Sequence, residues 1–109
     1  MFVFPAVIPW VMAEIKVSDD SWRLSSKHGN GVLRREVWED EHGCVVRYNL
    51  AYINQEIFQG DNGRVVGYDN SHGFHHRHYM GAVEPVEFTS FDAIEEKFEA
   101  DWTVFRRKI

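Results

Sequence analysis

Short turn signals divide the middle of this chain into segments that suit antiparallel hairpins. Residues 28–31, 40–43 and 60–63 are rich in glycine, asparagine and aspartate, which tolerate positive φ angles, and two of these segments contain Asn-Gly. Parallel strands would need crossover connections of a dozen or more residues, for which the spacing leaves no room. The sequence therefore predicts that neighbouring strands pair in antiparallel order.

The runs between these turns are rich in β-branched and aromatic residues. Within residues 46–52 the larger apolar side chains occupy every second position, so positions 46, 48, 50 and 52 share one face of a strand. The expected strands are 14–17, 21–25, 32–38, 44–53, 64–68 and 83–88, and residues 77–80 begin or extend another.

The last twenty residues change to a helical period. Residues 89–92 (Thr-Ser-Phe-Asp) fit a capping box at the start of a helix, with aspartate in place of the preferred glutamate. We therefore predict an α+β fold, an antiparallel meander sheet of about five or six strands packed by one C-terminal helix at 89–108. The residues that mark the buried face of this helix, three or four positions apart, are Phe91, Ile94, Phe98, Trp102 and Phe105.

A chain of 109 residues suits a single domain with one core. We expect the sheet to span residues 12–88, with a histidine-rich segment at 67–80, after an apolar N-terminal arm at 1–11. The arm lacks the basic start of a signal peptide, and it is shorter than the about twenty apolar residues of a membrane span. It is interpreted as a translated extension before a start at Met12, or as a hydrophobic lead-in strand, with no membrane role.

Charge and cysteine content limit the classes of function. A formal net charge of −5 argues against broad, charge-driven coating of nucleic acid, but it leaves room for a small local site. The lone Cys44 excludes an intrachain disulfide and suits a reducing compartment. We therefore expect a cytoplasmic protein.

Four of the six histidines lie within residues 67–80, beside an arginine, an aspartate and two tyrosines. Histidine is the side chain that titrates closest to neutral pH, so such a cluster suggests proton transfer, metal ligation or phosphate binding. If residues 75–79 are extended, His76 and His78 share one face of the strand, while residues 75, 77 and 79 share the other.

Paired imidazoles of this kind suit cleavage of a phosphodiester bond in RNA. One ring can take the proton of a ribose 2′-OH and the other can protonate the leaving oxygen, in an order that the sequence does not assign. A guanidinium can hold the charge on the phosphate, and a carboxylate can orient one imidazole. We expect His76, His78, Arg77 and Asp69 to be catalytic, without a cofactor. The expected substrate-binding residues are Asn70, Tyr68, Tyr79, Arg64 and Arg47, and the two arginines are alternative phosphate clamps.

A divalent metal such as zinc is the chief chemical alternative at the same segment. The spacing of the histidines matches no common structural zinc pattern. A histidine-rich polar loop without catalysis, in which Asp69 and Asn70 only cap turns, also stays open. The candidate metal ligands are His72, His75, His76 and His78, with Asp69 as a further one.

Several motifs in this chain resemble the TumE family of small prokaryotic proteins, which are described as toxins of toxin–antitoxin pairs. The resemblance covers about residues 32–107 and departs at His75, where family members often carry aspartate. It rests on Gly-Tyr-Asp-Asn at 67–70, Gly73, His-Arg-His-Tyr at 76–79, Glu-Pro-Val-Glu-Phe at 84–88, the helix start at 89–91 and the strand at 45–50. The active core that it implies is Asp69, Asn70, His76, Arg77 and His78.

The same resemblance implies a protein that inhibits growth unless it is bound by an antitoxin encoded nearby, typically a DNA-binding regulator. Together with the histidines, it predicts a metal-independent, ribonuclease-like toxin whose partners are the antitoxin and RNA. A metal-dependent hydrolase at the same histidines and a non-enzymatic module that binds a partner are the alternatives. A homodimer stays open.

Overall fold

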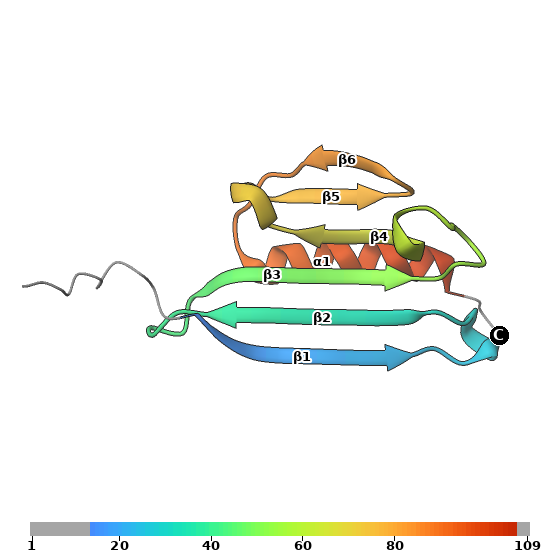
Figure 1. The fold of residues 1–109 in the computed structure, drawn as a ribbon, viewed down its shortest axis with the longest axis horizontal. Helices are drawn as coiled ribbons and strands as arrows, with labels where there is room; N and C mark the ends of the chain where they lie inside the picture. The colour runs from blue at the N-terminus through green and yellow to red at the C-terminus, as the bar shows by residue number, and fades with distance from the viewer. Residues whose placement is uncertain (1–13, 107–109) are drawn as a thin grey trace, which may run out of the picture.

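The computed structural model describes residues 14–106, which form one antiparallel sheet and one α-helix. Six strands lie in the order β1-β2-β3-β4-β5-β6, and α1 runs across one face of the sheet, behind β3 and β4 (Figure 1). The predicted α+β meander with one C-terminal helix is therefore confirmed, whereas the expected apolar arm at 1–11 lies outside the described residues. The elements are β1 Ile15–Arg23, η2 Ser26–His28, β2 Val32–Glu39, β3 Val45–Ile53, η3 Asp61–Gly63, β4 Arg64–Asp69, η4 Ser71–Gly73, β5 His76–Tyr79, β6 Ala82–Pro85, α1 Phe91–Trp102 and η5 Thr103–Phe105.

Several predicted boundaries were wrong. The helix expected at 89–108 ends at Trp102, and the 3-10 turn η5 follows it at Thr103–Phe105. The two strands expected at 14–17 and 21–25 are one continuous strand, β1, which carries a β-bulge between Lys16 and Ser18. The polar run inside it suits an exposed edge strand and does not interrupt pairing. The strand expected at 83–88 ends at Pro85, and one further backbone bond follows it, from the N–H of Val86 to the carbonyl of His75 at 3.0 Å. The helix is capped by Ser90, whose Oγ accepts from the backbone N–H of Ala93 at 3.1 Å, and not by a capping box at 89–92.

The core lies between α1 and the face of the sheet that α1 covers. Tyr48, Leu50 and Tyr52 of β3 alternate onto this face, as the period of two predicts, and they are almost fully buried. Opposite them in the register of β4 lie Tyr68 and Val66. Ile94 and Phe98 of α1 close the cluster from the helix side. Burial of this aromatic and aliphatic surface holds the helix on β3 and β4.

The other face of the sheet, which we call the open face, carries the residues between these core positions. Pairing places Asn49 of β3 opposite Asp69 of β4, and Asp69 opposite His76 of β5. Two residues further along the same pair of strands, Gly67 lies opposite His78. Because side chains alternate along each strand, these residues project away from α1.

Truncation of the central helix residue tests the packing described above. Ile94→Ala should lower the free energy of unfolding by about 3 kcal/mol, because the side chain is fully buried and its removal leaves a cavity. Urea unfolding followed by circular dichroism measures the change. Val104→Ala is the control, since Val104 is 73% exposed and should change stability by no more than about 0.5 kcal/mol. Equal effects of the two variants would contradict the assigned core.

Candidate functional site

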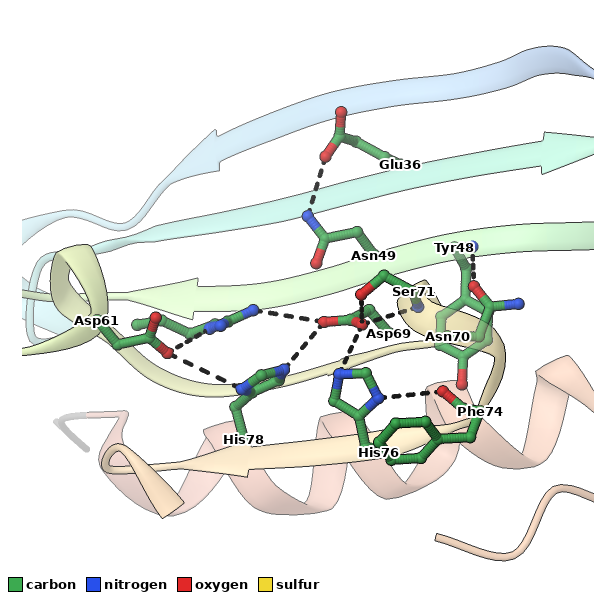
Figure 2. A network of polar contacts seen from close by, with 11 residues as sticks. Glu36, Tyr48, Asn49, Asp61, Asp69, Asn70, Ser71, Phe74, His76 and His78 are labelled. Atoms are coloured by element: carbon green, nitrogen blue, oxygen red, sulfur yellow. Dashed lines mark hydrogen bonds and ion pairs between the residues drawn. The ribbon is translucent and has the colours of Figure 1, made fainter. Parts of the chain in front are cut away.

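A carboxylate and two imidazoles converge on the open face, and we call Asp69, His76 and His78 the Asp–His centre. Oδ1 of Asp69 lies 2.9 Å from Nε2 of His76, and Oδ2 lies 3.0 Å from Nε2 of His78 (Figure 2). Their ligand atoms all lie within 4.8 Å of one another, and the three side chains are largely buried. The two rings of β5 therefore share one carboxylate at the end of β4.

The turn after β4 fixes the position of the carboxylate. The Asn70 side chain is hydrogen-bonded to the backbone of β3. Its Oδ1 accepts from the N–H of Tyr48 at 3.1 Å, and its Nδ2 donates to the carbonyl of Val46 at 3.0 Å. Ser71 donates to Oδ1 of Asp69 from its backbone N–H at 3.0 Å and from its hydroxyl at 2.7 Å. These bonds make an Asx-type turn that holds the carboxylate against the open face.

The environment of Asp69 favours the ionised form. Burial raises the pKa of a carboxyl group, but the bonds from Ser71, and the positive charges that His76 and His78 carry when they are protonated, act in the other direction and outweigh it. The pKa of Asp69 is therefore held below its ordinary value. The centre contains a buried anion that accepts hydrogen bonds from several sides.

The His76 ring is 4% exposed, and both of its nitrogens face acceptors. Nδ1 lies 3.0 Å from the backbone carbonyl of Phe74, and a carbonyl only accepts, so this nitrogen carries a hydrogen. Nε2 faces the Asp69 carboxylate, which also accepts when ionised. Both contacts are favourable if the ring is an imidazolium, or if a metal cation lies between Nε2 and the carboxylate.

The His78 ring has one nitrogen without a close partner among the described residues. Nε2 donates to Asp69, whereas Nδ1 lies 4.0 Å from Oδ2 of Asp61, which is too long for a hydrogen bond. Burial and the charge of Arg64 lower the pKa of His78. The ring is therefore neutral at neutral pH, and its Nδ1 lone pair can accept a proton.

Arg64 supplies a guanidinium to the same face. Its Nε donates to Asp61 at 2.8 Å, and its Nη1 lies 3.5 Å from Oδ2 of Asp69. The stem of Arg64 passes over Gly67, where a Cβ would lie 2.8 Å from Cδ of Arg64 and 2.8 Å from the carbonyl oxygen of Leu50. A side chain at this position would therefore displace the stem of Arg64 or the backbone of β3.

A hollow of about 290 Å³ opens beside Asp69 on the open face. A second hollow, of about 300 Å³, shares Asn49 and Arg64 with the first and continues toward Arg34 and Asp61. Together they form a shallow path large enough for a small anionic group next to the Arg64 guanidinium. The first hollow is lined by Glu36, Trp38, Arg47, Tyr48, Asn49, Arg64, Asp69 and Ser71.

The predicted residues Arg77, Tyr68 and Tyr79 are not brought together with the Asp–His centre. They alternate onto the face that α1 covers, where Nε of Arg77 and the hydroxyl of Tyr68 both donate to Oδ2 of Asp101, at 2.8 and 2.6 Å. The Arg77 guanidinium also lies 4.4 Å from the ring centre of Tyr79. Of the three arginines considered as phosphate clamps, the structure places only Arg64 in contact with the centre.

The four-histidine metal set expected from the sequence does not assemble. His72 is exposed in η4 with a φ of 62°, and His75 packs against Phe88 with ring centres 4.0 Å apart. Burial lowers the pKa of His75 and raises that of Tyr48 to about 12, so the Tyr48 hydroxyl donates to Nδ1 of a neutral His75 at 2.9 Å. A metal at this segment would have Asp69, His76 and His78 as ligands instead.

Arg47 and Asn70, the remaining predicted residues, lie near the centre in different ways. Arg47 lines the hollow, stacks 4.1 Å above Trp38 and pairs with Glu14 at 3.2 Å. The amide of Asn70 is used at both ends by the backbone of β3, so its role is structural.

Sequence reasoning missed two residues of the site, Asp61 and Ser71. Residues 60–63 were interpreted as a hairpin turn, yet Asp61 is bound to Arg64 and faces His78. The signal for Ser71 was present, because a serine two positions after an aspartate is typical of a side-chain-stabilised turn.

Comparison with known proteins agrees with the resemblance found in the sequence. A family model described as Toxin TumE matches residues 19–108. Neither the curated proteins nor the solved structures give a match. Within the described residues, no helix combines the length and the apolar character that crossing a membrane requires.

The ionisation of Asp69 gives the site a testable pH dependence. The pKa of Asp69 in the folded state is below the ordinary value of 3.8, so the unfolded chain binds the proton more tightly. The ionised carboxylate therefore stabilises the fold at pH values above 3.8. This contribution is lost as the pH falls through the pKa of the folded state. Asp69→Asn should therefore be clearly less stable than the parent near about pH 7, and the gap should narrow near about pH 3. Urea unfolding at both pH values measures it.

The exposed turn residue Glu41 provides the control, since Glu41→Gln should stay close to the parent at both pH values. A stability gap for Asp69→Asn that is the same in acid and at neutral pH would contradict the assignment of a buried, ionised carboxylate.

Proposed function

The chain belongs to the TumE toxin family, and from this premise we propose that it is the toxin of a prokaryotic toxin–antitoxin pair and that it acts on RNA at the Asp–His centre. The observation that carries the proposal is the convergence of Asp69, His76 and His78 beside the Arg64 guanidinium and an open hollow. The partner is an antitoxin encoded nearby, a DNA-binding regulator, and the pair acts in the cytoplasm.

His78 is the proposed general base. Its neutral ring has a free Nδ1 lone pair, while Nε2–H is fixed on Asp69, which sets the tautomer. A pKa below the usual histidine value keeps the base unprotonated at neutral pH, which is the form that the reaction needs. His76, buried and bonded at both nitrogens, serves as a positioning group that holds the carboxylate in place.

The proposed reaction is attack of a ribose 2′-OH on the adjacent phosphorus. The 2′-OH proton passes to Nδ1 of His78, the 2′ oxygen bonds to phosphorus, and the bond to the 5′ oxygen breaks. The leaving oxygen takes a proton from water, and the hydroxide formed takes the proton back from Nδ1 of His78. Arg64 stabilises the charge that develops on the phosphoryl oxygens. Arg77 does not take this role, because it projects toward α1 and is paired with Asp101. The products are a 2′,3′-cyclic phosphate and a 5′-OH end.

Replacement of the base tests this function. His78→Ala should abolish growth inhibition when the protein is produced in a bacterial host, with little change in the melting temperature, because Asp69 keeps its bonds from Ser71 and His76. His78→Gln should be equally inactive, since its amide can still donate to Asp69 but cannot accept a proton as a base. Colony counts after induction and incubation of purified protein with RNA give the readouts.

His72→Ala is the matched control, because this exposed histidine of η4 lies outside the centre and should leave growth inhibition unchanged. A His78→Ala protein that remains fully toxic would refute the assigned base. RNA whose 2′-OH groups are methylated should resist cleavage, and cleavage of that RNA would refute the proposed nucleophile.

A metal-dependent hydrolase at the same centre is the second candidate, and one observation favours it. Nδ1 of His76 is bonded to the backbone carbonyl of Phe74, and the Nε2 atoms of both rings turn toward Asp69 (Figure 2). Metal-ligating histidines are typically oriented by such acceptors on the second nitrogen. Asp69, His76 and His78 would hold a divalent ion such as zinc, which, when bound, activates water for hydrolysis.

Metal content separates the two candidates. If the centre holds a metal, the purified protein should contain about one ion per chain, and calorimetric titration with zinc chloride should show a binding site that His76→Ala removes and His72→Ala retains. If the acid–base proposal is correct, metal-stripped protein should cleave RNA at an unchanged rate in EDTA. Zinc binding together with loss of cleavage in EDTA would overturn the metal-free mechanism.

A further inference from the structure

A larger hollow, of about 630 Å³, lies on the opposite face of the sheet, beside α1. We call it the α1 groove. It exists because α1 packs on β3 and β4 and does not cover β1 and β2, which lie to one side of the helix (Figure 1). The residues that line its floor and walls include Trp22, Leu33, Leu50, Phe98 and Trp102.

The floor of the α1 groove is apolar and partly open. Trp22 of β1 lies opposite Leu33 of β2 in the strand register, and Leu33 lies opposite Tyr52 of the core. The groove is therefore continuous with the hydrophobic core, yet Trp22 is 49% exposed. A large aromatic side chain at the rim of a core is the type of anchor that dominates protein–protein interfaces.

The helix side of the groove is acidic. Asp92, Glu95, Glu96 and Glu99 line it from successive turns of α1. Glu95 is paired with Arg35 of β2 at 2.7 Å. Within residues 14–106, no ion pair joins the other three carboxylates to a basic side chain. Arg34 also lines the groove, but it pairs with Asp19 at 2.8 Å. The four carboxylates of α1 therefore outnumber the two arginines of the lining, and the groove is acidic.

We propose that the α1 groove binds a basic, amphipathic segment of a partner protein. Apolar side chains of that segment pack on Trp22 and Leu33, and lysine or arginine side chains pair with Asp92, Glu96 and Glu99. The inference goes beyond the proposed function, because the groove lies on the face away from the Asp–His centre.

Charge argues against the other occupants of the α1 groove. Nucleic acid would bring its phosphates against the carboxylates of α1, which repel them. A symmetric dimer through this face would place two copies of the same acidic wall near each other, because a two-fold interface uses the same patch on both subunits. A basic partner removes this repulsion and buries Trp22 at the same time.

Peptide binding to the full-length protein tests the proposal. The probe is a fluorescein-labelled synthetic helix of leucine and lysine with an apolar face, and a matched helix with glutamate in place of lysine is the comparison. The lysine peptide should bind in a salt-sensitive manner and the glutamate peptide should not. The double variant Glu96→Lys/Glu99→Lys should weaken binding about tenfold at low salt, and Trp22→Ala should weaken it at every salt concentration.

Glu41→Lys is the matched charge control, because Glu41 lies in an exposed turn and should leave affinity within about twofold of the parent. Circular dichroism confirms that each variant is folded. Equal binding of the two peptides, or no effect of the groove substitutions, would overturn the proposal, as would sedimentation data showing a dimer that Trp22→Ala dissociates. His78→Ala should bind the lysine peptide normally, so a failure of the proposed RNA chemistry is distinguishable from a failure of the groove.

Discussion

The buried carboxylate of Asp69 is the interaction on which the open face depends. A charge removed from water is costly unless partners compensate it, and here the partners come from the turn after β4 and from β5. The same carboxylate therefore closes the η4 turn, fixes the position of β5 and orients two imidazoles. Loss of His76 or Ser71 would leave part of the charge uncompensated, so the arrangement of the centre and the local fold are not separable.

The alternation of side chains along β5 gives its His-Arg-His-Tyr motif two different tasks. His76 and His78 project onto the open face and make the centre, whereas Arg77 projects toward α1. There it shares Asp101 with the hydroxyl of Tyr68, which ties β4, β5 and the helix together. Thus only the two histidines of the motif belong to the centre, whereas Arg77 connects the sheet to the helix.

The sequence predicted the parts of this structure that depend on local pattern. Glycine and asparagine turns gave the antiparallel order, the period of two gave the buried face of β3, and it also placed His76 and His78 together. The same alternation places Arg77 on the other face, but it could not show that Arg64 meets the two histidines, because that depends on the register between β4 and β5 and on the space above Gly67. Asp61 was missed for the same reason, since its side chain meets His78 only through the pairing of distant segments.

The charges of the open face bear on how an acidic protein could carry out the proposed reaction on RNA. Three of its arginines already have a carboxylate partner: Arg34 pairs with Asp19, Arg47 with Glu14, and Arg64 with Asp61. At these three positions a phosphate gains a guanidinium only by displacing a carboxylate. Long-range attraction of nucleic acid is weak under these conditions, whereas a single phosphodiester beside Arg64 can be held closely. If the proposed function holds, such a surface favours recognition of a short, accessible stretch of RNA over the coating of a duplex.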